Sequence, residues 1–599
     1  MRQVDPGIYP FWFWNDHLDH DEIRWQIGEM SAQGVQGFFL HPRQGLGQPY
    51  LSESFFSCVC VAIEAAESHG MIVHLYDEYP YPSGVAGGEV VSGRPEYRAT
   101  RLIQRAYDVS GGHVRLQFPK GHILGVTAHR IVDGSPDWAD GIDLRPHTGM
   151  SLDQESYNET GLTAYNQKRY FASDPTPTLE VELPEGCYRI YASVQAEVAR
   201  HKYWDHFVDV LNPDAVRRFL TLTHERYHER FGDKFGQSIA TIFVDETRPG
   251  WSTRIPKAFR DRYGYDLLSH LVALQDSEHP DHLRISFDLY NLRYELFCES
   301  FEKPIAAWCE QHGLGYSGEK HALRFDQMRY QDVPGCDPGH TKVGARSDMY
   351  GGDARRNARA TASGAYFYDK QGALCECYHS MGWSATLQDA KLVGEELLLN
   401  GISYLVPHGF FYTTHGLKKH DAPPTFFFQM PYWPFFGRLS DRFSRIWEQF
   451  RDTWIDAHIL LIEPESGMPS KRDHEIYTET QFALLSRHLE FLMADVEVLR
   501  GGTITQGELR IKDLTISSIV ITPTRMMRPE LAEWLRDSEA QGLDIVRVDR
   551  NSDPTEVINS IAAEGALAIT ASNDTHRDVR MVLRKRPDGS CVYFMINTS

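Results

Sequence analysis

The sequence predicts an α/β fold, a (β/α)8 TIM barrel with an inserted β domain and a C-terminal flavodoxin-like α/β domain. Two observations support this prediction. Short apolar segments alternate with amphipathic helical segments, which is typical of a parallel sheet covered by helices. Several apolar segments also end in carboxylates, and a parallel barrel brings the carboxyl ends of all its strands to one mouth.

Eight segments have the composition of barrel strands. Asp19 and Ser52 can cap the helices after the first two strands, and Gly34 and Gly70 can end those helices. The sixth strand is short and contains Pro334, which cannot donate a ladder hydrogen bond. The predicted strands cover residues 10–15, 34–43, 71–78, 239–246, 314–319, 332–337, 372–379 and 402–409.

The alternation of strand and helix segments is interrupted once and ends before the C-terminus. Residues 1–105 hold strands one to three, and residues 106–200 show the alternation of an inserted β domain. The barrel resumes over 201–455, with a helix from Asn212 to Phe231. Residues 456–599 read as an open α/β domain without the GxGxxG turn of a dinucleotide site. Its last segment could begin a further, truncated β domain.

Composition limits the classes of partner. The chain has 599 residues, a formal charge of -21 and a pI near 5.7, which argues against nucleic acid and anionic membrane surfaces. No stretch has the length of a membrane span and no signal peptide is visible. Nine cysteines without a regular framework favour reduced thiols. We therefore expect a cytoplasmic protein, and the C-terminal domain could serve association into a homo-oligomer.

Acidic residues close several of the predicted strands. Glu246 ends strand four and Glu376 ends strand seven, opposite each other across a barrel mouth. Glycoside hydrolysis needs one carboxyl group to protonate the leaving oxygen and another to attack the anomeric carbon or activate water. We expect Glu246 to be the general acid and Glu376 the nucleophile or base, with Glu319 competing for either role. Solvated strand ends and helix caps are the alternative explanation for such acids.

Other polar and aromatic side chains lie at the same strand ends. Imidazole and guanidinium groups can hydrogen-bond sugar hydroxyls, and an indole can stack on a sugar ring. Residues 82–90 lack the ending of a phosphate loop and are better explained as a tight loop shaping the pocket. The predicted substrate-binding residues are Trp14, Asn15, His41, Arg43, Tyr76, Asp77, Glu78, Asp245, Asp337, Trp383, His408 and Tyr412.

The sequence also resembles a known family. The segments PFWFWND, GFFLHPRQGLGQPYLSE, HLYDEYPYPSGVAGGEV and GISYLVPHGFFYT are similar to the catalytic barrel of α-L-rhamnosidase-like glycoside hydrolases. The resemblance covers about residues 8–450. It implies inversion at the anomeric carbon. From this resemblance and from the loops, which suggest a pocket, we expect an exo-acting enzyme that releases a terminal sugar such as α-L-rhamnose from an oligosaccharide or glycoside. The resemblance also implies a calcium ion near the substrate, close to Glu319 and Glu376.

Two other functions fit parts of the sequence. The first is a catalytically silent glycan-binding protein that keeps the aromatic cleft. The second is a zinc metallopeptidase, because His224, Glu225 and His228 satisfy HExxH on a predicted helix and Glu246 follows as a third ligand. However, the apolar stripe of that helix places the histidines at its edge, as in an outer barrel helix. Calcium, zinc or no metal in the purified protein would distinguish the three functions.

Overall fold

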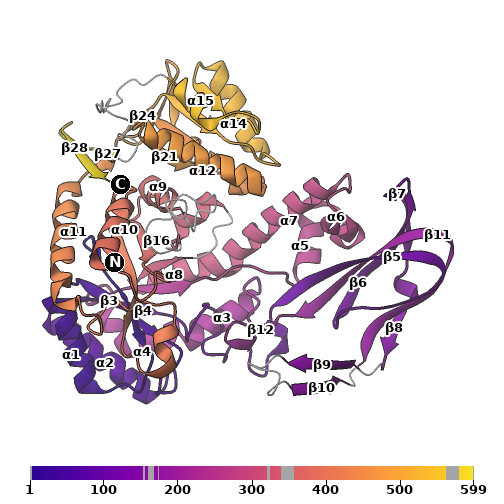
Figure 1. The fold of residues 1–599 in the computed structure, drawn as a ribbon, viewed down its shortest axis with the longest axis horizontal. Coiled ribbons are helices and arrows are strands. Elements are labelled where there is room, and N and C mark those ends of the chain that lie inside the picture. The colour runs from indigo at the N-terminus through magenta and orange to yellow at the C-terminus, as the bar shows by residue number, and fades with distance from the viewer. Residues whose placement is uncertain are drawn as a thin grey trace. The chain divides into compact units, whose positions relative to one another are not determined.

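The computed structural model describes residues 3–152, 155–159, 168–172, 175–319, 324–338, 357–561 and 579–597. The chain forms two compact units. The first contains Met1–Val90, Val216–Arg248 and Cys298–Ser599, and the second contains Val91–Ala215 and Pro249–Phe297. Figure 1 shows the ribbon and labels many of the elements named below.

The first unit contains a closed parallel barrel, which confirms the predicted fold class. Its eight strands follow one another around the ring, and the last pairs with the first. The short β1 (Gly7–Ile8) also pairs with β18 and precedes β2. The eight strands are β2 (Phe11–Trp14), β3 (Gly37–Pro42), β4 (Ile72–Tyr76), β14 (Ile239–Asp245), β15 (Gly315–Glu319), β16 (Val333–Cys336), β17 (Leu374–Cys377) and β18 (Tyr404–Phe411).

Several helices of this unit start at polar caps. The Asp19 carboxylate accepts the amides of Asp21 and Glu22 at the start of α1 (His20–Ala32). Ser52 caps α2 (Glu53–Ser68) in the same way. The other helices that accompany the barrel are α8 (Lys303–Gln311), α9 (Ala358–Phe367), α10 (Leu387–Leu399) and α11 (Phe436–Phe450).

One predicted helix is divided in the structure. The segment expected as a single helix from Asn212 to Phe231 forms α3 (Pro213–Leu222) and α4 (His224–Phe231). Thr223 separates them, and its hydroxyl donates to the Phe219 carbonyl at 2.9 Å. Such a side-chain bond to the preceding turn competes with the helical backbone and bends it.

The barrel interior follows the alternation of each strand. Phe11 and Phe13 of β2, Phe243 of β14 and Leu374 of β17 belong to one buried apolar cluster. Residues between them, such as Trp12, face the helices, because successive strand residues point to opposite sides. The Trp12 indole donates to the α1 residue Gln26 at 2.8 Å. This alternation determines which acidic side chains at the strand ends face the mouth of the barrel.

The second unit contains the β segment. Its main sheet has the antiparallel order β5, β11, β6, β7, with β8 also paired to β11. These strands are β5 (Thr100–Gln117), β6 (His122–Val132), β7 (Ser135–Asp143), β8 (Thr148–Ser151) and β11 (Thr176–Glu197). The unit also contains α5 (Ile255–Tyr263), α6 (Leu271–Gln275) and α7 (His282–Phe297).

The C-terminal part of the first unit is an open sheet. Parallel strands lie in the order β21 (Phe491–Ala494), β20 (Ile459–Ile462), β25 (Ser518–Ile521), β26 (Asp544–Arg547), which is the 2-1-3-4 order of a flavodoxin-like sheet. Its helices are α12 (Lys471–Ser486), α13 (Val496–Leu499), α14 (Pro529–Ala540) and α15 (Pro554–Asn559).

Smaller elements complete this region. A three-stranded sheet that the sequence did not indicate contains β22 (Thr503–Thr505), β23 (Glu508–Ile511) and β24 (Leu514–Ile516). The sequence around Asp588 and Gly589 predicts a hairpin, and β27 (Val579–Lys585) and β28 (Cys591–Asn597) form it. The apolar segment 566–570 also predicts a strand, but it lies outside the described residues. All nine cysteines are free thiols, and none of the described helices is both long and apolar enough to cross a bilayer.

Candidate active site

Three buried carboxylates meet at the mouth of the barrel. Asp245, Glu319 and Glu376 are the inward-facing acids near the carboxyl ends of β14, β15 and β17, and one carboxylate oxygen of each lies within 4.8 Å of the others. Asp245 and Glu319 are register partners on adjacent strands. The exposed fractions of the three residues are only 5%, 1% and 8%. Their proximity follows from the parallel barrel, as the sequence suggested.

Glu246 occupies a different position from the three clustered acids. It follows β14, is half-buried and has a left-handed backbone conformation with φ of 47°. Its amide donates to the Glu319 carbonyl at 2.9 Å. Asp245 therefore holds the inward position at the end of β14, and Glu246 lies one residue beyond the strand.

A chain of polar contacts holds one side of the cluster. The Tyr76 hydroxyl donates to Asp245, and burial raises the pKa of Tyr76 further above its usual range, so the hydroxyl stays protonated. His41 stacks on Tyr76 with ring centroids 3.7 Å apart. Arg43 lies 3.2 Å from the His41 ring nitrogen and forms a bidentate pair with Asp421 at 2.6 and 2.8 Å. Burial, together with the Arg43 charge, holds the pKa of His41 well below its usual range.

Histidines lie on the other side of the cluster. His408 Nε2 is 4.0 Å from a Glu376 oxygen, and His379 Nε2 is 2.8 Å from Asp337. Burial and the Arg43 charge lower the pKa of His408 to about 3, so this imidazole is neutral at ordinary pH. His379 was missed in the sequence, although its position two residues after the strand-end residue Cys377 placed it near the mouth.

Three predicted binding residues are committed to contacts within the protein. Trp14 is fully buried and packs against Phe55 of α2, because it has the outward parity of β2. The Asn15 amide group both donates to and accepts from the Thr413 backbone, at 3.0 and 3.1 Å. The Tyr412 hydroxyl accepts the Asp19 amide at 3.0 Å. These contacts show how the three side chains are held, and their contact with substrate stays a prediction.

Glu78 and Asp77 organise the loop after β4. Both are fully buried. Glu78 accepts the amides of Tyr79, Gly84, Val85, Ala86 and Gly87 at 2.7 to 3.0 Å. Asp77 accepts the Ser83 hydroxyl at 2.5 Å, and Ser83 in turn accepts the Asp245 amide at 2.8 Å. In the structure these two acids shape the loop beside Asp245, and their contact with substrate stays a prediction.

Trp383 is a predicted substrate-binding residue whose side chain is exposed to solvent. It follows β17 and is 40% exposed, unlike the fully buried Trp14. An indole at such a position can offer its face to a sugar ring.

Asp421 provides a test of the polar network by pH. Burial acts to raise the pKa of Asp421, but the hydrogen bonds and charge of Arg43 outweigh it and leave the pKa lowered. We expect Asp421→Asn to lower the free energy of unfolding at pH 7 by about 2 kcal/mol, less than the full cost of breaking a buried pair, because the Asp421 side chain is 23% exposed.

The pH dependence of this difference follows from the sign of the shift. A lowered folded-state pKa gives stability that is complete above the ordinary value of 3.8 and is lost as the pH falls further. Denaturation of both proteins between pH 7 and pH 3 measures it. A difference between wild type and variant that stays constant down to pH 3 would contradict the assignment.

Part of the chain that carries this site matches a known protein family. Residues 199–420, which carry five of the barrel strands and the three clustered acids, match the family described as α-L-rhamnosidase. Over this stretch the chain is similar to α-L-rhamnosidases. The comparison with curated proteins finds no match.

Solved structures agree on the fold of this chain. The rhamnosidase from Novosphingobium sp. PP1Y is 13% identical with a TM-score of 0.67, over 99% of this chain and 77% of that one. The β-galactosidase of Halorubrum lacusprofundi is 12% identical with a TM-score of 0.54, over 92% and 73%. The GH42 β-galactosidase Gan42B from G. stearothermophilus is 10% identical with a TM-score of 0.52, over 100% and 81%.

The HExxH motif of this chain does not form a peptidase site. His224 is fully buried, and its Nδ1 lies 2.8 Å from the Thr223 hydroxyl. Glu246, the expected third ligand, follows the carboxyl end of β14, whereas α4 precedes the opposite end of that strand. The metallopeptidase interpretation is therefore wrong. Glu225 and His228 have a different neighbour, described below.

Proposed function

We propose that the protein is an exo-acting glycosidase that releases a terminal sugar, α-L-rhamnose first among the candidates, from an oligosaccharide or glycoside. The observation that carries the proposal is the cluster of Asp245, Glu319 and Glu376 at the barrel mouth. Buried carboxylates favour the positive charge that develops on the sugar ring in the transition state of glycoside hydrolysis. The match of residues 199–420 to α-L-rhamnosidases supports the choice of sugar.

The spacing of the carboxylates supports a division of roles. Oxygens within the cluster lie within 4.8 Å of one another, closer than the roughly 6.5–9.5 Å that an inverting acid and base require. An inverting pair must therefore combine one clustered acid with a carboxyl group outside the cluster. We propose Glu246 as the general acid that protonates the leaving oxygen, and Glu376 as the base that takes a proton from the attacking water.

The substrate and the stereochemistry can be tested together. p-Nitrophenyl α-L-rhamnopyranoside should be hydrolysed faster than the corresponding β-D-galactopyranoside and α-L-fucopyranoside. Proton NMR of the first product should show the anomer of inverted configuration. Binding of these glycosides without any released sugar would overturn the proposal and favour a silent glycan-binding protein.

The same cluster fits calcium. Calcium prefers several carboxylate oxygens, and here the oxygens of three buried acids converge while Asp337 lies beside Glu376. We propose that Glu319 and Asp245 hold the ion together with Glu376. When bound, calcium would offset the carboxylate charge and coordinate sugar hydroxyls, whereas the proton transfers belong to Glu246 and Glu376.

Removal of calcium is expected to lower activity strongly. After treatment with EGTA, kcat/KM for the aryl rhamnoside should fall by at least about tenfold, and added CaCl2 should restore it. Glu319→Gln should weaken calcium binding in calorimetry, whereas the exposed control Glu448→Gln should not. An enzyme with full activity after chelation, shown metal-free by elemental analysis, would contradict the calcium proposal alone.

A further inference from the structure

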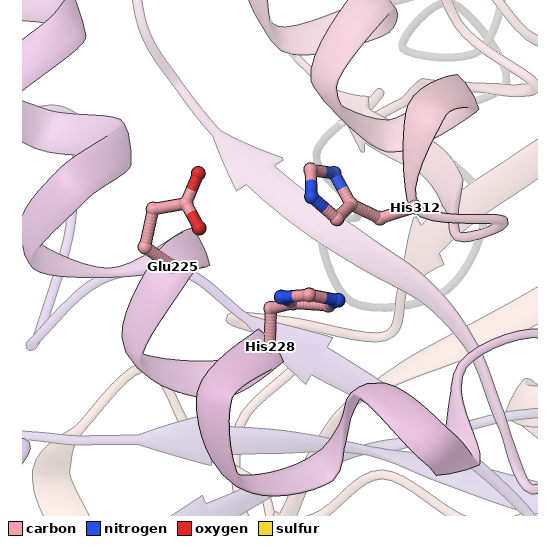
Figure 2. A group of neighbouring side chains, drawn as sticks. All are labelled: Glu225, His228 and His312. Atoms are coloured by element: carbon pink, nitrogen blue, oxygen red, sulfur yellow. The ribbon is translucent and has the colours of Figure 1, made fainter.

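We propose that Glu225, His228 and His312 form a second metal site, for a divalent transition metal such as zinc, outside the barrel mouth. One possible ligand atom from each of the three side chains lies within 4.8 Å of the others. Figure 2 shows Glu225 and His228 on one helix and His312 on the facing segment, with their side chains directed toward a common space. Nothing in the glycosidase mechanism uses these residues.

Trp308 holds two of the ligands in the orientation that a metal needs. Its indole donates to Glu225 Oε1 at 2.6 Å, which leaves Oε2 for an ion. The Trp308 carbonyl lies 2.7 Å from His312 Nδ1. This contact requires Nδ1 to carry the hydrogen, so Nε2 carries the lone pair. Metal-binding histidines commonly donate their other ring nitrogen to a carbonyl in this way.

Stacking and spacing complete the arrangement. The His312 ring stacks on Trp308 with centroids 4.1 Å apart, and the His228 ring is 4.3 Å from His312. In the described part of the chain, no hydrogen bond engages the ring nitrogens of His228. A tetrahedral zinc ion with bonds of roughly 2.0–2.1 Å would draw the three ligand atoms together by about 1 Å, which small side-chain rotations allow.

The ligand types select the metal. Two imidazoles and one carboxylate match the His2Glu set found in zinc sites, whereas calcium and magnesium prefer oxygen alone. The three residues are half-buried, so an ion can enter and water can occupy the fourth position. The structure thus favours zinc here and calcium at the mouth.

The position of the site indicates its effect. His228 lies in α4, which precedes β14, and His312 follows α8, which precedes β15. The clustered acids lie at the other ends of these strands, and the seven residues of β14 span roughly 20 Å. An ion here would cross-link α4 to α8 and stabilise the fold without contacting substrate.

Calorimetry on the full chain tests the site. The metal-stripped protein is first saturated with CaCl2, so that the mouth is occupied, and is then titrated with ZnCl2. We expect one zinc ion per chain and a higher unfolding temperature. His228→Gln and His312→Gln should each weaken zinc binding by at least about tenfold, and Trp308→Phe by about 10–100-fold.

Matched controls separate this site from other zinc ligands. His69→Gln and Glu229→Gln change exposed residues of α2's end and of α4 and should leave zinc affinity unchanged. His312→Gln should also leave kcat for the aryl rhamnoside unchanged. The proposal is overturned if the wild type binds no zinc, if His228→Gln and His312→Gln bind it as tightly as wild type, or if only Glu319→Gln reduces binding.

Discussion

Glu246→Gln and Glu376→Gln are each expected to lower kcat on rhamnosides by about 10²–10⁴-fold, the usual contribution of a positioned acid or base. Glutamine keeps the size of the side chain but cannot exchange a proton. The exposed residue Glu448 provides the control, since Glu448→Gln should leave kcat unchanged. Steady-state kinetics with circular dichroism of each variant measure the effect on a folded protein.

The leaving group distinguishes the two roles. A 2,4-dinitrophenyl rhamnoside needs no protonation of its leaving oxygen, so the activity of Glu246→Gln should recover largely on this substrate. Glu376→Gln should stay impaired on both substrates, because water activation is still required. If only Glu376→Gln recovers activity on the 2,4-dinitrophenyl rhamnoside, Glu376 is the general acid and Glu246 the base. Near wild-type turnover of both variants would refute the assignment. In that case Asp245→Asn and Glu319→Gln identify the acting residues.

Glu78→Gln is expected to have the largest effect on local stability. The Glu78 carboxylate accepts five loop amides, and an amide group in its place would leave at least two of them buried without an acceptor. Each loss costs about 1–3 kcal/mol, so we expect a destabilisation of about 3–5 kcal/mol. Hydrogen exchange should accelerate at the amides of residues 84–87.

The neighbouring Glu89 supplies the control for this prediction. Glu89 is exposed at the end of the same loop, so Glu89→Gln should preserve slow exchange. Unchanged exchange in Glu78→Gln would show that the carboxylate does not organise the loop. A higher KM with unchanged exchange would instead support the substrate-binding role that the sequence suggested for Glu78.

The barrel was predictable because its signals are local. Each strand is a short apolar segment between a glycine stop and a polar cap, as at Gly34 and Ser52, and these signals fixed all eight strands. The division of the helix at Thr223 was not predictable, because it depends on a single hydrogen bond from the Thr223 hydroxyl to the Phe219 carbonyl. The sheet formed by β22, β23 and β24 was missed since its strands have only three or four residues.

The sequence analysis named all three clustered acids, Asp245, Glu319 and Glu376, but not that these three lie together. Strand alternation directs the side chain of Asp245 into the barrel and that of Trp14 toward the helices. Once one inward-facing residue of a strand is known, the sequence predicts the facing of the others. The partner of Arg43 was not accessible in the same way, because Asp421 is 378 residues away. Glu78 illustrates a third case, in which an acid at the right strand end accepts the amides of its own loop.

The aromatic core of the barrel has a consequence for catalysis. Phe11, Phe39 and Phe243 pack against one another in the buried barrel core, and Phe243 is two residues before Asp245 on β14. Walls of low dielectric constant concentrate an electric field toward the open side. The attraction felt by a sugar ring as it becomes cationic therefore depends on hydrocarbon it never touches.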